Sequence, residues 1–142
     1  MKKTIKSFVS CVLMLAFILT LVACQKGVDV KGLWEKATYT KDTTFGNGAT
    51  TVMVEVKVED QSVTFTIKTD KTTLGEALME HDLITGEQGQ FGIYIKSVNG
   101  ITADYDVDRS YWAFNKNGEM MMTGVDMTNI ADGEHYELVY TK

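Results

Sequence analysis

In the stretch ADYDVDRSYW, three alternating carboxylates are followed closely by two aromatic rings. The carboxylates are those of Asp104, Asp106 and Asp108, and the rings are those of Tyr111 and Trp112. Alternating carboxylates are the first ligands of calcium loops, whereas tyrosine and tryptophan rings either stack against ligands or fill a core. The stretch therefore predicts a hard-cation site, a ligand platform, or a solvated acidic loop that leads into an aromatic strand.

The cation interpretation meets only part of the EF-hand pattern. A loop that began at Asp104 would need glycine at its sixth position and glutamate at its twelfth, but Arg109 and Asn115 stand there. On a strand, side chains two residues apart are roughly 7 Å from each other, which is too far for three of them to reach one ion at about 2.4 Å. A bent loop could bring them together, so Asp104, Asp106 and Asp108 form an alternative metal site of the calcium type.

Residues that could support catalysis are few and scattered. His81 and His135 lie far apart and outside any HExxH-type spacing. None of the serines beyond the first 24 residues stands in a GxSxG motif. A second acidic group, Asp126 with Asp132 and Glu134, is weaker than the first. We therefore expect a protein that is not an enzyme.

The start of the chain predicts a secretory leader and a lipid anchor. Lys2, Lys3 and Lys6 precede an uncharged apolar run over residues 8–23, and the motif LVAC ends this run at Cys24. A basic start, an apolar run and a small residue before cysteine are the features of a bacterial lipoprotein signal peptide. We expect residues 1–23 to be removed and Cys24 to carry diacylglycerol, whose two acyl chains would hold the protein on the outer side of a bacterial cell membrane.

Charge and cysteine content exclude several functions. The chain has a formal net charge of −5, and loss of the three lysines in the leader would make it more acidic. An acidic surface repels phosphate backbones, so nucleic acid is not an expected partner. With Cys11 in the leader and Cys24 lipidated, no thiol would remain for a disulfide or a soft-metal site.

The segment after the leader predicts a tether and then one domain. Residues 24–33 are short and polar, as in a tether, and a single domain is expected over residues 34–142. The domain is expected to open with a strand in WEKATYT, from Trp34, whereas residues 41–49 have the glycine and asparagine of a loop.

The clearest periodic signal predicts a β-hairpin. Apolar and polar side chains alternate over residues 52–58 and again over residues 63–67. This period of two is typical of strands with one buried and one solvated face.

A helix is expected next. The segment TTLGEAL (72–78) places a threonine three residues before a glutamate, as in a capping box, and its leucines and alanine form a helical stripe. We therefore expect a helix over residues 74–82, with His81 at its C-terminal end as a partner of the helix dipole rather than a ligand.

Beyond this helix the sequence predicts a loop over residues 84–90 and then further strands. The strands are expected at residues 91–98, 111–115 and 135–141 and directly after Gly118, with hairpin turns at Asn99–Gly100 and Asn117–Gly118. A hairpin, a helix and several strands in this order predict a single α+β domain. A β-grasp-like mixed sheet with one main helix is the natural candidate.

Four motifs in a fixed order carry a resemblance to a known family. They are TLGEAL from Thr73, FGIYIKSVNG from Phe91, the pair Tyr111–Trp112, and a segment that opens with GVD and closes with DGE over residues 124–134. This part of the chain resembles the C-terminal β-domain of the transcobalamin and intrinsic-factor cobalamin carriers, and especially the bacterial secreted domains related to it. The resemblance implies a β-grasp-like fold.

The resemblance also implies a ligand, because in the carriers this domain closes over one face of a corrinoid. The carriers place a large helical domain before it, so a partner would supply the other half of the site here. Tyr94, Tyr111 and Trp112 are the candidate ligand-binding residues, although Trp112 could equally fill the core. The alternatives are a calcium-type surface domain, and an envelope interaction or adhesion domain with Tyr94 and Trp112 exposed in one patch.

Overall fold

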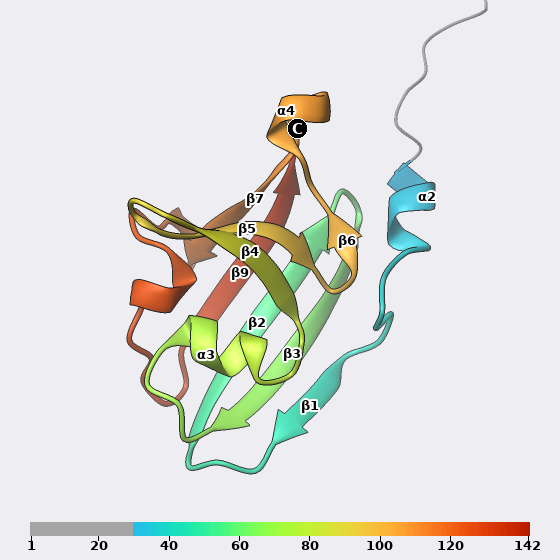
Figure 1. The fold of residues 1–142 in the computed structure, drawn as a ribbon. Helices are drawn as coiled ribbons and strands as arrows, with labels where there is room; N and C mark the ends of the chain where they lie inside the picture. The colour runs from blue at the N-terminus through green and yellow to red at the C-terminus, as the bar shows by residue number, and fades with distance from the viewer. Residues whose placement is uncertain (1–29) are drawn as a thin grey trace, which may run out of the picture.

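The computed structural model describes residues 30–142 (Figure 1). The predicted leader, Cys24 and residues 24–29 of the predicted tether lie outside the described residues. Within the described part, no helix is long and apolar enough to cross a membrane.

Two sheets make up most of the domain. In chain order the strands are β1 (Thr43–Gly46), β2 (Thr50–Val58), β3 (Gln61–Thr69), β4 (Ile84–Gly89), β5 (Gly92–Val98), β6 (Ile101–Thr102), β7 (Tyr111–Lys116), β8 (Glu119–Met120) and β9 (His135–Thr141). The helical segments are α2 (Val30–Trp34), α3 (Leu74–Met79), α4 (Tyr105–Asp108) and the 3-10 turn η1 (Val125–Met127). The larger sheet is mixed and has the order β1-β3-β2-β9-β7-β8, and β4, β5 and β6 form an antiparallel second sheet.

The smaller sheet and α3 cover one face of the larger sheet (Figure 1). The core lies between these layers, since the buried side chains of β2, β3, β7 and β9 belong to the same apolar cluster as those of α3, β5 and η1. This arrangement confirms the predicted α+β domain with a mixed sheet and one main helix. The separate three-stranded sheet is a feature that the sequence did not predict.

The β2–β3 hairpin confirms the alternating pattern. Its strands pair antiparallel from Thr50↔Thr69 to Val58↔Gln61. The four valines of β2 that share a face are 0–1% exposed, and Phe65 and Ile67 of β3 are 0% exposed. One face of the hairpin is therefore core and the other meets solvent, as expected for an antiparallel pair under a covering layer.

Helix α3 has the predicted capping box. The Thr73 hydroxyl accepts a hydrogen bond from the Glu76 amide at 3.3 Å, and the Glu76 carboxylate accepts one from the Thr73 amide at 3.3 Å. The helix ends at Met79, earlier than predicted, because Asp82 takes a left-handed conformation (φ 53°) and turns the chain. The Leu83 amide then donates to the Leu78 carbonyl at 3.0 Å, and the chain enters β4.

Three local predictions before and after α3 are wrong. Trp34 ends helix α2 and does not begin a strand, residues 41–49 contain strand β1, and residues 84–90 contain strand β4 instead of a loop. Strand β4 has no apolar alternation to detect, because only its first residue, Ile84, is buried. Pairing with β5 creates this strand, and such a tertiary contact leaves no periodic trace in the sequence.

Both predicted Asn-Gly turns are confirmed. Asn99 and Gly100 have φ values of 51° and 81°, and Asn117 and Gly118 have the same values. These angles fit the left-handed positions of a type I′ hairpin turn. The Asn99 side chain is buried as well: it accepts from the Tyr39 amide at 2.9 Å and donates to the Tyr39 carbonyl at 2.8 Å, which ties the segment after α2 to the smaller sheet.

Candidate functional site

Strand β7 is paired along its whole length on one side only. Strand β9 pairs with β7 from Tyr111 to Lys116, but on the other side β8 pairs only with Asn115 and Lys116. Beyond the β8 pairing, the Phe114 carbonyl accepts from the Met121 amide at 2.9 Å. The start of β7 therefore presents a strand edge, and the nearby strand β5 belongs to the other sheet.

Two hollows lie beside this edge and share Tyr94 and Tyr111. The first has a volume of about 220 Å³, and β5, β7 and residues 120–125 line it. The second is more open, with a volume of about 490 Å³, and is lined by Tyr94, Lys96, Tyr105, Asp106 and Tyr111. We refer to the two hollows together as the β5–β7 groove. Apolar and aromatic side chains predominate in its lining, as in sites for small ligands.

The predicted aromatic trio lies in this groove, but its members differ in exposure. Tyr94 is 41% exposed and Tyr111 is half-buried, whereas Trp112 is only 6% exposed. The Trp112 indole Nε1 donates to the Ile101 carbonyl at 3.2 Å, and its ring stands edge-on to Tyr140 with centroids 5.6 Å apart. Trp112 is therefore a wall of the groove and part of the core, so it does not form an exposed patch with Tyr94.

Sequence reasoning missed Lys96, Tyr105 and Arg109 at this site. The Lys96 ammonium lies 5.0 Å from the centroid of the Tyr94 ring, and the Arg109 guanidinium lies 5.0 Å from that of Tyr105. Tyr105 meets Tyr111 edge-on at 6.4 Å. The alternation of Tyr94 and Lys96 on one face of β5 was a usable signal, since residues two apart on a strand project together.

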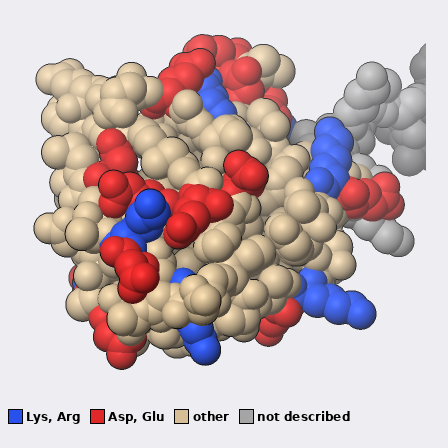
Figure 2. Space-filling model, turned by 60° about the horizontal axis from the view of Figure 1, so that its bottom comes forward, with Lys and Arg blue, Asp and Glu red and all other residues tan. Residues whose placement is uncertain are grey.

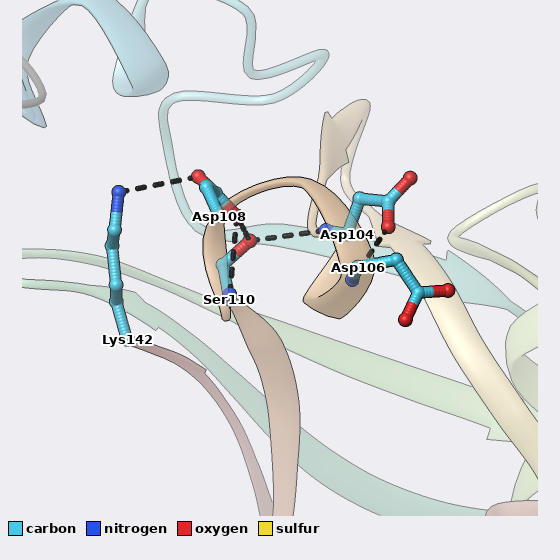
Figure 3. Close-up of polar contacts among 5 residues, drawn as sticks. All are labelled: Asp104, Asp106, Asp108, Ser110 and Lys142. Atoms are coloured by element: carbon cyan, nitrogen blue, oxygen red, sulfur yellow. Dashed lines mark hydrogen bonds and ion pairs between the residues drawn. The ribbon is translucent and has the colours of Figure 1, made fainter.

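The three aspartates do not converge on one point (Figure 3). Asp104 is the N-cap of α4, and its carboxylate accepts from the Asp106 amide at 3.0 Å. The Asp108 carboxylate turns the other way: it accepts from the Ser110 hydroxyl and amide and, at 3.3 Å, from Lys142. The Asp106 carboxylate lies on the same side of α4 as that of Asp104, away from Asp108. The segment is thus a solvent-exposed, capped helical turn in which the three carboxylates do not meet at one point.

Local hydrogen bonding stabilises the ionised form of one of these carboxylates. The Ser110 hydroxyl and amide, together with Lys142, hold the pKa of Asp108 below its ordinary value. Within residues 30–142, no group of three or more His, Cys, Asp or Glu side chains is placed to hold a metal ion. The calcium-type site stays a prediction for which the described residues offer no preformed ligand set.

The second acidic group also makes structural contacts. The Asp126 carboxylate accepts from the Ile93 amide at 2.7 Å, and that of Asp132 accepts from the Thr51 amide at 2.7 Å. Glu134 accepts from Lys116 at 2.6 Å and from the Tyr136 hydroxyl. These carboxylates connect segments far apart in the sequence, which is a sufficient reason for their presence.

His81 lies at another cavity, on the far side of α3. This cavity of about 240 Å³ is bordered by residues 46–48 and 68–71 and by Glu80 and His81. The His81 ring stacks on Phe45 with centroids 5.1 Å apart, and its Nε2 is 3.9 Å from the Glu80 carboxylate. The stacking on Phe45 accounts for the position of this ring without any ligand.

The chain is similar to proteins whose structures have been solved. A candidate metal-binding protein from Ruminococcus gnavus ATCC 29149, solved at 1.30 Å, is 35% identical with a TM-score of 0.62, and the match covers 66% of this chain and 98% of that one. Haptocorrin in complex with Cbi is 21% identical with a TM-score of 0.56; 69% of this chain matches 26% of haptocorrin. The latter match shows a shared fold, that of a transcobalamin-like domain, as the four motifs predicted.

Among curated protein sequences, none matches this chain. The family model for a domain of unknown function, DUF4430, matches residues 71–142, from the turn before α3 to the end of β9. This span includes β5, α4 and β7, and therefore both walls of the β5–β7 groove. The chain belongs to the DUF4430 family.

Proposed function

We propose that this protein is a lipid-anchored, non-catalytic binding module outside the cell membrane that takes a small ligand in the β5–β7 groove. The observation that carries the proposal is the meeting of two hollows, of about 220 and 490 Å³, between the rings of Tyr94 and Tyr111. An apolar concavity with a few polar groups at its rim is the usual form of a ligand site.

The groove is suited to a ligand with a broad flat surface. Tyr94 of β5 and Tyr111 of β7 present partly exposed rings, and the buried Trp112 ties β7 to β6 through its hydrogen bond to Ile101. Met120 and Met121 line the far end, and unbranched methionine side chains adapt to the shape of what they contact. Rings fixed on strands lose little conformational entropy when a ligand stacks on them.

A corrinoid is the ligand that we propose first. The shared transcobalamin-like fold and the complex of haptocorrin with Cbi support this choice. Because the chain matches only 26% of haptocorrin, we propose that a separate envelope protein covers the other side of the ligand. Binding by the isolated chain would then be weaker than binding with that partner, since the ligand would stay half solvated.

The test is equilibrium dialysis of the full chain against cobinamide and cobalamin, with bound corrinoid read from its visible absorption. We expect saturable binding that falls at least about fivefold in the Tyr94→Ala/Tyr111→Ala variant, because two stacking surfaces are lost. Met79→Ala is the matched control, since Met79 on α3 is as exposed as Tyr94, at 41%. Equal loss in the control, or no saturable binding up to the solubility limit of the corrinoids, would reject the corrinoid proposal.

The anchor is tested separately. Cys24 lies outside the described residues, and the proposal for it rests on the LVAC motif after an apolar run. Cells fed an alkyne-tagged fatty acid should label the wild-type protein, and Cys24→Ser should remove the label and release the protein from the membrane fraction. Cys11→Ser, a cysteine within the proposed leader, should leave both unchanged.

Hard-cation binding is a second candidate function. The relative from Ruminococcus gnavus ATCC 29149 is named as a candidate metal-binding protein, which favours this alternative. A cation that binds the folded state should raise the melting temperature by mass action. An unchanged melting temperature in millimolar calcium, together with wild-type behaviour of Asp106→Ala, would remove this candidate.

A further inference from the structure

Two cations lie at the groove of an otherwise acidic protein. The chain has a formal net charge of −5, and Figure 2 shows acidic and basic side chains interspersed on one face of the molecule. Lys96 lines the more open hollow, and Arg109 stacks on Tyr105, another of its lining residues. Arg109 is the only arginine in the sequence. The lining of the same hollow also contains the Asp106 carboxylate, so the two cations stand beside an acidic side chain and not in a purely basic patch.

Neither cation is neutralised within the described part of the chain. Lys57, Lys116 and Lys142 form ion pairs with carboxylates there, at distances of 2.6–3.4 Å. Lys96 and Arg109 form none in residues 30–142, and each instead lies 5.0 Å from the centre of a tyrosine ring. A cation over a ring keeps its hydrogen-bond donors available, because the ring attracts the charge without accepting conventional hydrogen bonds.

The backbone also holds Arg109 in an uncommon conformation. Arg109 is the C-cap of α4 and has φ 65°, in the left-handed region that non-glycine residues enter rarely. Its amide donates to the Tyr105 carbonyl at 3.0 Å, and the Ser110 hydroxyl donates to the Asp108 carboxylate beside it. These bonds fix the arginine next to Tyr105, so its position over the ring does not depend on the flexible side chain alone.

One acidic group opposes an anion at this site. The Asp106 carboxylate lines the same hollow, and Figure 3 shows it on the same side of α4 as Asp104 and on the opposite side from Asp108. An anion bound near Lys96 and Arg109 would be repelled by it, whereas a cation would be attracted. The sign of the effect of Asp106 therefore separates the two classes of ligand.

We propose that the β5–β7 groove binds a ligand with a planar apolar body and an anionic group, a carboxylate or a phosphate. Tyr94, Tyr105 and Tyr111 stack on the planar body, and Lys96 and Arg109 bind the anionic group. This inference rests on the proposed function, because it names the chemistry of the ligand for the same groove. Charge complementarity with an acidic protein gives selectivity, since negatively charged molecules are repelled elsewhere on the surface.

The test compares two probes that differ only in charge, 2-naphthoate and 2-naphthamide. The full chain, in lipid nanodiscs and labelled with 13C at the methionine methyl groups, is titrated with each probe and followed by NMR. Met120 and Met121 report on the groove, and Met53 and Met79 report on other surfaces. We expect both probes to shift the groove methyl signals, and naphthoate to bind about fivefold or more tightly than naphthamide at low salt.

Three variants assign the anion preference to residues. Lys96→Gln/Arg109→Gln should remove most of it, since an exposed charge pair contributes roughly two- to fivefold in affinity for each cation. Lys36→Gln/Lys41→Gln, which makes the same change of net charge on exposed lysines after α2, should retain the preference. Asp106→Asn should strengthen naphthoate binding by about twofold. Lipid uptake of the probes is the same for all of these proteins and cancels when they are compared.

The outcomes separate the two proposals. Equal binding of the two probes, or an anion preference that survives in Lys96→Gln/Arg109→Gln, overturns the inference and leaves a groove for neutral ligands. Weaker naphthoate binding in Asp106→Asn overturns it as well. If neither probe moves the Met120 and Met121 signals and the corrinoids also fail to bind, the proposed function itself is rejected.

Discussion

Buried and more exposed side chains alternate on the strands at both ends of the larger sheet, but one end is closed by a core and the other borders a groove. Across β2, β3 and β9, α3 and the smaller sheet together cover the inner face, and Val54, Phe65 and Leu138 are 0% exposed. Along the start of β7 the neighbour on the far side is strand β5 of the smaller sheet, and a groove remains between β5 and the edge of β7. The same cover therefore makes a closed core over the middle of the larger sheet and leaves room for a ligand at the edge of β7.

The partners of charged side chains also differ between the closed end and the groove. At the closed end, carboxylates accept from backbone amides or from lysines, as Glu137 does from Lys57 and Asp132 does from Thr51. At the groove, Lys96 and Arg109 lie over tyrosine rings and have no carboxylate partner in the described residues. Charged groups with protein partners connect segments of the fold, and solvated charged groups at a concave surface are available to a ligand.

Phe65→Ala, at the closed end, should lower the free energy of unfolding more than any other variant. The Phe65 ring is 0% exposed and meets Phe45 and Tyr39 with centroids 5.5 and 5.8 Å apart. Its loss should lower the free energy of unfolding by about 3–5 kcal/mol, because a cavity remains. Phe91→Ala is the matched control: Phe91 is 73% exposed between β4 and β5, and its loss should cost less than about 0.5 kcal/mol. Urea denaturation of both variants measures the difference, and similar losses would contradict the closed-core description.

Glu134→Ala should have the next largest effect and a distinct pH dependence. The variant leaves the buried Tyr136 hydroxyl and Lys116 without their acceptor, which should lower the free energy of unfolding by about 1–3 kcal/mol at pH 7. Burial favours the protonated carboxyl, but hydrogen bonds from Lys116, Tyr136 and Ala131 outweigh it and lower the pKa of Glu134.

The sign of the pH effect follows from that lowered pKa. A carboxyl group with a lower pKa in the folded state stabilises the fold above its ordinary pKa of about 4.3, and this contribution disappears as the pH falls through the folded value. The difference between wild type and Glu134→Ala should therefore shrink between pH 7 and pH 3 in urea denaturation. A difference that grows on acidification would contradict the assigned network.

Thr73→Ala should cost about 1 kcal/mol, because the N-cap hydroxyl of α3 is lost. Thr73→Ser keeps a hydroxyl at the same position and should retain most of the stability. Since α3 is part of the cover of the closed end, hydrogen exchange should rise in α3 and in β2 beneath it, with little change in β7. Faster exchange in β7 alone would show that α3 does not separate the two ends.

Features with a local cause were predictable from the sequence. Alternating valines predicted β2, the TLGE motif predicted the start of α3, and Asn99–Gly100 predicted a hairpin turn, because each depends on a few neighbouring residues. Strand β4 was missed because it exists through pairing with β5, and helix α2 was missed because residues 30–33 were assigned to a polar tether.

The residues of the candidate site also fall into those that the sequence predicted and those that it did not. Tyr94 and Tyr111 were predicted, and the structure brings them to one groove. The i, i+2 spacing of Tyr94 and Lys96 and the i, i+4 spacing of Tyr105 and Arg109 could have indicated these two cation–ring pairs, but that both pairs lie beside Tyr111 depends on how β5, α4 and β7 meet. The alternating aspartates have separate local roles that their spacing does not reveal: Asp104 is the N-cap of α4 and binds the Asp106 amide, whereas Asp108 binds Ser110 and Lys142.

Tyr94→Ala should have the smallest effect on stability and a clear effect on the groove. The ring is 41% exposed, so its removal should change the free energy of unfolding by less than about 0.5 kcal/mol. Affinity for 2-naphthoate should fall roughly two- to tenfold, the range expected for one stacking contact, whereas Tyr94→Phe should retain most of the binding. Trp112→Phe, on the neighbouring wall, should affect stability more than ligand binding. It removes the hydrogen bond to Ile101, which should lower the free energy of unfolding by about 1 kcal/mol. If both variants lost stability and binding together, the groove would be a continuation of the core, and the distinction between the two ends of the sheet would not hold.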